Sequence, residues 1–145
     1  MNDSAQQQLE ALDLSLFFGV ASDDPMFRES ATELAEMIWS NFLNEEVPYL
    51  LPDENSDELA DLMSKEDITQ DEIMDLFRRA IEDFDAIYKK YVLKNKAETI
   101  RGRITELQHE YEGDEVKLRS LNEIEELALA EEWQQVAELF EKLNQ

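Results

Sequence analysis

The sequence predicts an all-α protein. Glycine and proline number three each in 145 residues, too few for the many tight turns of a sheet protein. Apolar residues recur at steps of three and four along most of the chain, which is the spacing of one helical face. Hydrophobic residues make up 43% of the chain, enough to bury a core. We expect one domain, or one domain with a small appendage.

The N-terminal part of the chain shows two helices. Apolar periodicity predicts a first helix over residues 9–20, which Gly19 and the polar residues after it interrupt. Asp24 and Pro25 then form a helix start, because a carboxylate can cap the helix and proline suits its first position. This second helix is expected to continue to about Val47.

A loop and a short helix follow. Two of the three prolines lie in residues 47–57, so this segment is predicted to be a loop, with a short helix over residues 59–63. Thr69 and Glu72 have the T-x-x-E spacing of a capping box, which predicts the start of a long helix.

The long helix changes its apolar face halfway along. Its first half carries one apolar face: Ile73, Phe77, Ile81, Phe84, Tyr88 and Tyr91. Its second half carries another: Leu93, Ala97, Ile100, Ile104, Leu107 and Tyr111. The step from Tyr91 to Leu93 turns the face by roughly 200°. We interpret the long helix as shared by two subdomains; the alternative is two helices that meet at a kink near Asn95.

The C-terminal third is predicted to be an antiparallel helical hairpin. Gly113 can end the long helix in the left-handed conformation, and Asp114 can cap a last helix over residues 115–143. The predicted organisation is therefore an N-terminal helical bundle (residues 1–92) joined by a long helix to a C-terminal antiparallel helical hairpin (residues 93–145).

The hairpin supplies the candidate partner-binding residues. A pair of helices without a further layer leaves apolar groups partly exposed, and exposed aromatic residues are typical interface hot spots. The candidate contacts are Leu118, Leu121, Trp133, Val136, Phe140 and Leu143. The alternative is that Trp133 and Phe140 seal the hairpin itself. A dimer through the hairpin is a further possibility.

The charge of the chain restricts its partners. The net charge is −23, and residues 1–77 hold 2 basic and 20 acidic side chains, or −18. Residues 78–103 hold 8 basic and 4 acidic side chains, or +4, and residues 104–145 hold 3 and 12, or −9. Such a surface repels phosphates, so we expect no direct nucleic-acid binding. A basic protein partner, imitation of DNA, or simply a well-solvated surface remains open.

A basic band interrupts the acidic chain: Arg78, Arg79, Lys89, Lys90, Lys94, Lys96, Arg101 and Arg103. It could contact an acidic partner. The alternative is that it neutralises the acidic segments packed beside it or solvates the helix.

Catalytic and metal-binding patterns are not found in the sequence. His109 is the single histidine, and there is no cysteine. Asp53, Asn55 and Asp57 match the start of a calcium loop, but the sixth position is Glu58 instead of glycine. We therefore expect no enzyme, no catalytic residue, no metal and no cofactor. The N-terminus does not read as a signal peptide and no apolar run could span a membrane, so a cytoplasmic location is expected.

Three stretches resemble the C-terminal helicase-binding domain of bacterial DnaG-type primases. They are DDPMFRESATELAEMI at residues 23–38, the long-helix segment at residues 68–108, and ELQHEYEGDEVKLRSLNEIEEL at residues 106–127. The first resembles the Asp-Pro-x-x-Arg helix start of that bundle, the second its last bundle helix and connector, and the third its hairpin turn.

The resemblance implies a role in DNA replication. A domain of this family docks on the N-terminal domains of the hexameric replicative DNA helicase, within the primosome, largely through its hairpin. The leading expectation is therefore a non-enzymatic protein-interaction module that binds this helicase, without membrane contact. The alternative is an acidic DNA mimic or inhibitor that blocks a DNA-binding protein.

Overall fold

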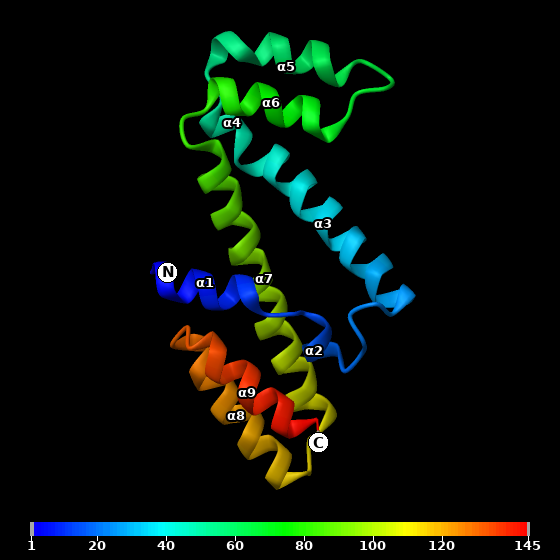
Figure 1. Cartoon of the computed structure of the whole chain (residues 1–145), viewed down its shortest axis with the longest axis vertical. Helices are drawn as coiled ribbons and strands as arrows, with labels where there is room; N and C mark the ends of the chain where they lie inside the picture. Colours follow the sequence, from blue (N-terminus) through cyan, green and yellow to red (C-terminus); the bar gives the residue numbers. More distant parts are fainter. Residues whose placement is uncertain (1, 145) are drawn as a thin grey trace. The chain divides into compact units, whose positions relative to one another are not determined.

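Helices form the regular structure of the chain, as the sequence predicts. The computed structural model describes residues 2–144, and this part of the chain contains helices and turns but no strand. The elements are α1 (Asp3–Ala11), α2 (Ser15–Phe18), α3 (Pro25–Glu45), α4 (Val47–Leu50), the 3-10 helix η1 (Asp53–Asn55), α5 (Ser56–Met63), α6 (Gln70–Ala80), α7 (Phe84–Glu110), α8 (Glu115–Leu129) and α9 (Trp133–Leu143) (Figure 1).

The chain divides into two compact units. The first unit holds the described residues up to Leu34 together with those from Leu93 onward, and the second unit is Ala35–Val92. The boundary after residue 92 coincides with the division expected from the sequence. The structure differs in the N-terminal segment, because residues up to Leu34 belong with the C-terminal part and not with the bundle.

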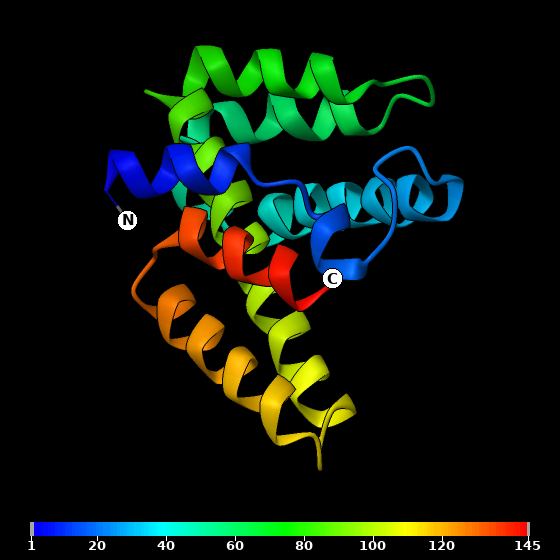
Figure 2. The same cartoon turned by 60° about the horizontal axis from the view of Figure 1, so that its bottom comes forward.

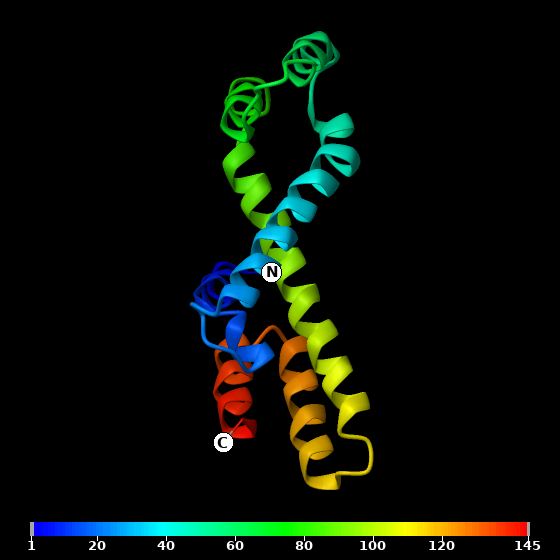
Figure 3. The same ribbon diagram turned by 90° about the vertical axis from the view of Figure 1, so that its right-hand side faces the viewer.

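The first unit is built around α7, α8 and α9. Figure 3 shows α8 between α9 and the C-terminal half of α7, and Figure 2 shows α1 beside α9. The backbone N–H of Gln134 donates to Gln8 Oε1 at 3.2 Å, which links α9 to α1. The buried core of this unit is Ala5, Leu9, Phe17, Leu93, Ala97, Ile100, Ile104, Leu107, Leu121, Ile124, Ala128, Trp133, Val136 and Phe140.

The second unit has an aromatic core. Phe42 is fully buried, with its ring centroid 5.0 Å from that of Tyr88 and 5.2 Å from that of Tyr91 in edge-on arrangements. Beside this core α5 and α6 run side by side as a helical pair (Figure 1). The buried residues of this unit are Phe42, Val47, Leu51, Ile73, Leu76, Phe77, Ile81 and Phe84.

The change of apolar face along α7 is confirmed. Tyr88 and Tyr91 pack against the core of the second unit, whereas Leu93 and Ala97 are buried in the core of the first. The helix α7 runs without interruption through Asn95, so two separate helices do not meet there. One helix thus supplies a different face to each core.

The first predicted helix is in fact two helices. α1 ends at Ala11 and α2 begins at Ser15, instead of one helix over residues 9–20. Asp13 Oδ1 accepts hydrogen bonds from the Ser15 backbone N–H at 2.9 Å and from the Ser15 hydroxyl at 2.7 Å. Such a local side-chain turn competes with helical hydrogen bonds and separates the two elements.

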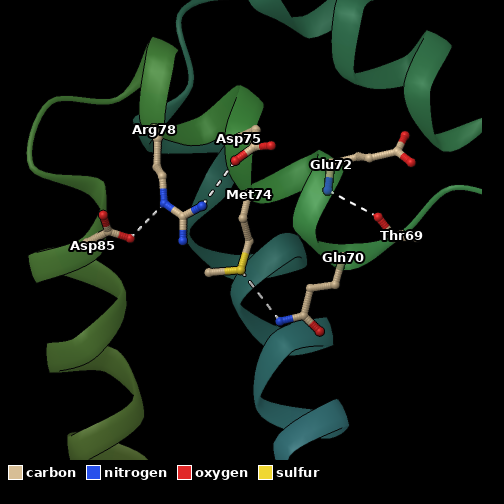
Figure 4. A network of polar contacts seen from close by, with 7 residues as sticks. All are labelled: Thr69, Gln70, Glu72, Met74, Asp75, Arg78 and Asp85. Carbon is tan, nitrogen blue, oxygen red and sulfur yellow. Dashed lines mark hydrogen bonds and ion pairs between the residues drawn. The ribbon is translucent and has the colours of Figure 1, made fainter.

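The predicted long helix is also interrupted, between α6 and α7. Thr69 caps α6 as expected, its hydroxyl oxygen accepting from the Glu72 N–H at 3.3 Å. Asp83 then adopts a left-handed φ of 57°, which breaks the helix. Arg78 spans the break by pairing with Asp75 and with Asp85 at 3.1 and 3.0 Å (Figure 4).

The last helix is likewise two, because the chain turns between α8 and α9. Glu131 adopts a left-handed φ of 60° at this turn. Asp114 caps α8 as predicted, accepting from the Lys117 N–H at 3.1 Å. The predicted turn joins α7 to α8, which run antiparallel, and α9 turns back beside α8 as a third helix.

The Asp13 turn predicts a pH-dependent stability. The hydrogen bonds from Ser15 hold the pKa of Asp13 below its ordinary value of 3.8. A carboxyl whose folded-state pKa is lowered stabilises the protein above its unfolded pKa, and this stabilisation disappears as the pH falls through the folded pKa. The free energy of unfolding of Asp13→Asn should therefore lie below that of the wild type at pH 6, with a gap that closes below pH 3.8.

Urea unfolding at a series of pH values measures this gap. Asp67→Asn is the control, because it makes the same chemical change at a carboxylate that accepts no hydrogen bond within the described chain. A gap for Asp13→Asn that persists unchanged at pH 2.5 would contradict the prediction.

Alanine substitutions at two glycines should change the stability of the protein in opposite directions. Gly102 lies inside α7, and an added Cβ there meets open space, so Gly102→Ala should stabilise the protein by about 0.5–1 kcal/mol. Gly113 has a φ of 97°, where a side chain is strained, so Gly113→Ala should destabilise it. Thermal unfolding measures both effects. A shift of the melting temperature that is equal in size and direction for the two variants would contradict the prediction.

Candidate protein-docking groove

Four of the six predicted partner-binding residues are core residues. Trp133, Leu121 and Val136 have no exposed surface, and Phe140 is 1% exposed. Leu118 and Leu143 are half-buried. The expectation of exposure is therefore wrong for the first four. The physical reason is that α1 and α2 pack on α9 and share one core with α7, α8 and α9, so these helices do not lack a further layer.

Contacts with the N-terminal segment close this core. The Phe17 ring lies 4.7 Å from the Phe140 ring, between centroids. The guanidinium of Arg101 lies over the Trp133 indole at 5.5 Å from its centroid. Arg101 Nε and Trp133 Nε1 are buried without a hydrogen-bond partner in the described chain. The largest aromatic residue of the hairpin thus stabilises the fold.

Three cations of the predicted basic band bind helix ends inside the first unit. Lys96 Nζ donates to the Leu12 carbonyl at 2.6 Å and Arg103 Nε to the Phe17 carbonyl at 2.9 Å. Arg101 donates to the Ala128 carbonyl at 3.3 Å. These carbonyls lie at the C-terminal ends of α1, α2 and α8, where the helix dipole favours positive charge. Partial burial lowers the pKa of Lys96.

Two further members of the band pair with acids of the second unit. Arg79 binds Glu58 of α5 at 2.9 Å, which joins α6 to α5. Arg78 pairs with Asp75 of α6 and Asp85 of α7, on either side of the break between these helices. Five of the eight cations of the band therefore have partners within the chain: Lys96 and Arg101 bond carbonyl groups, Arg78 and Arg79 pair with carboxylates, and Arg103 does both.

An apolar groove opens on the first unit. Its volume is about 380 Å³. One wall is the first part of α3 with its cap: Asp24, Met26, Phe27, Ser30, Ala31 and Leu34. The other wall comes from α2, its flanking residues and α7: Leu14, Phe18, Val20 and Thr99. The rings of Phe18 and Phe27 face one another with centroids 6.4 Å apart.

The α3 wall has unusual exposure for an apolar helix face. Phe27, Ala31 and Leu34 lie at the i, i+4, i+7 spacing of one face, and all three are only half-buried. Met26 is 79% exposed, and Phe18 and Val20 are each 40% exposed. From Pro25 to Leu34 the helix buries no residue fully. No other segment of the described chain buries this face fully, in contrast to the core residues of the same unit.

The polar groups of the groove are mostly engaged. Asp24 Oδ1 caps α3 by accepting from the Met26 and Phe27 N–H groups at 2.9 and 3.2 Å. The Thr99 hydroxyl donates to the Asn95 carbonyl at 2.9 Å. The groove therefore offers apolar surface and few polar groups that could orient a small molecule.

Sequence periodicity alone does not reveal the groove. Phe27 and Leu34 have the spacing of one apolar stripe in the helix that begins at Pro25, and Val20 lies at the end of the predicted first helix. One feature of the sequence does point to the groove: Met26 is an apolar residue at the start of this helix that lies outside the apolar stripe. Sequence periodicity does not distinguish a covered face from an open one, because the cover comes from other segments.

Residues 2–144 hold no cluster of three His, Asp or Glu side chains that could bind a metal ion. Every helix in this range is too short or too polar to cross a membrane.

Comparisons with known proteins add no relative. The chain matches no protein-family model, and it has no significant match among curated proteins or solved structures.

The burial of Trp133 predicts a structural role that can be measured. Trp133→Ala removes a fully enclosed side chain and should lower the free energy of unfolding by about 3–5 kcal/mol. Leu129→Ala is the control, because Leu129 is 66% exposed on α8 and should change stability by no more than about 0.5 kcal/mol. Chemical denaturation checks both; equal, small effects would show that Trp133 is not part of the core.

Proposed function

We propose that this protein is a non-enzymatic interaction module that binds another protein through the apolar groove of its first unit. The observation that carries the proposal is the open α3 wall, where Phe27, Ala31 and Leu34 remain half-buried beside the exposed Met26. Contiguous apolar surface of this kind on a chain with a net charge of −23 is typical of a binding surface.

The replicative DNA helicase is the proposed partner. This choice is supported by the resemblance of three sequence stretches to the helicase-binding domain of primases. The contact would differ from the one that the resemblance implies, because the large apolar residues of the α8–α9 pair fill the core. The groove offers apolar side chains that are free to contact a partner.

Size-exclusion chromatography with a purified hexameric replicative helicase tests the proposal. We expect the two proteins to elute together at about 100 mM and at about 400 mM salt, because apolar contacts resist screening. Met26→Asp should weaken this association about tenfold. Tyr49→Asp is the matched control, since Tyr49 is 88% exposed in the second unit and should leave binding unchanged.

The other outcomes of this experiment discriminate between classes of function. Association with a DNA-binding enzyme that disappears steeply with salt would instead support imitation of DNA by the acidic surface. Helicase binding that Met26→Asp and Tyr49→Asp leave equally intact would reject the groove as the contact.

A further inference from the structure

We propose that the occupant of the groove is an amphipathic helix of the partner whose apolar face is flanked by lysine or arginine. This inference rests on the proposed function and specifies the chemistry of the partner segment.

The shape of the open wall favours a helix. The side chains of Phe27, Ala31 and Leu34 form an i, i+4, i+7 ridge along α3, and such ridges fit the grooves of a second helix. Exposed apolar residues on both walls, Met26 on α3 and Val20 opposite, can contact its apolar face. Helix-in-groove recognition uses apolar anchors at this same spacing.

The polar side chains of the groove favour an apolar ligand over a small polar one, because they already bond the backbone. The capping bonds of Asp24 and the hydroxyl bond of Thr99 are directed to the backbone. A ligand in the groove would therefore gain most of its binding energy from burial of apolar surface. An amphipathic helix supplies that surface and keeps its polar side in water.

The charge around the groove favours a basic helix. Residues 20–34 carry four carboxylates and one arginine, Arg28. Asp23 and Glu33, which adjoin the lining residues Asp24 and Leu34 in sequence, are exposed and take part in no ion pair within the described chain. A lysine or arginine beside the apolar face of the partner would find unpaired carboxylates there.

Two cations of α7, Lys96 and Arg103, stand three and four positions from Thr99 of the opposite wall, and the Arg103 guanidinium lies 5.3 Å from the centroid of the Phe18 ring. Arg103 donates to the Phe17 carbonyl and pairs with Glu106 at 3.1 Å. Lys96 donates to the Leu12 and Glu10 carbonyls at 2.6 and 3.3 Å. Both cations keep their charge, but neither pairs with a carboxylate of α3 within the described chain. Residues 20–34 by themselves carry a net charge of −3, from four carboxylates and Arg28.

Three synthetic helices test the inference. Each is fluorescein-labelled and carries the same leucine face, with lysine, glutamine or glutamate at all other positions. Fluorescence anisotropy with the full chain at about 150 mM salt measures binding. The lysine helix should bind about tenfold tighter than the glutamine helix, and the glutamate helix should bind weakest.

Paired variants separate the groove from the general acidity of the chain. The double variant Val20→Ser with Met26→Ser removes exposed groove side chains and should weaken the lysine helix about tenfold. Its control, Tyr49→Ser with Met63→Ser, removes exposed apolar residues of the second unit and should have no effect. Circular dichroism verifies that both remain helical.

A second pair of variants tests the charge. Asp23→Asn with Glu33→Gln should weaken the lysine helix and leave the glutamine helix unchanged. Glu66→Gln with Asp67→Asn removes the same charge from the α5–α6 loop and should change neither.

The results distinguish failure of this inference from failure of the proposed function. Equal binding of all three helices, lost in the Val20 and Met26 variant, would retain the groove as a docking site and overturn the basic helix. Binding of the lysine helix that the groove variant does not change, or absence of binding by all three helices, would overturn this inference. The proposed function is decided separately, by the helicase experiment with Met26→Asp and Tyr49→Asp.

Discussion

The structure depends on one helix that presents opposite apolar faces to two cores. Because Tyr91 and Leu93 are two residues apart, their side chains point to different sides of α7. The residues before this step pack in the aromatic core of the second unit, and those after it form the central row of the first. A helix with one continuous stripe could serve only one of the two cores.

The same helix explains why an acidic chain keeps a basic band in its middle. The second half of α7 lies where α1, α2 and α8 end, and each of these ends exposes carbonyl groups that need donors. Lys96, Arg103 and Arg101 supply those donors. The apolar face and the cations of α7 therefore act on the same neighbouring helices. The apolar residues pack against these helices, and the cations beside them bond the carbonyl groups at the helix ends.

The arrangement that closes the core of the first unit also leaves the groove open. α1 and α2 pack on α9 and share one core with α7, α8 and α9, which encloses Trp133 and turns the expected contact surface into interior. The chain then continues into α3, whose first ten residues bury no side chain fully. The apolar surface available to a partner is therefore on the N-terminal segment, and acidic residues border it.

The sequence alone determined the helical class, the starts of α3, α6 and α8, and the change of face along α7. These features depend on residues three or four positions apart, as with Thr69 and Glu72 or Asp114 and Lys117, so the local chain contains them. Only the tertiary structure decided that Trp133 is enclosed, that α8 and α9 are separate, and that the α3 face stays open. Burial depends on which distant segments supply cover: Phe17 meets Phe140 across more than a hundred residues of chain, and no local pattern specifies that pairing.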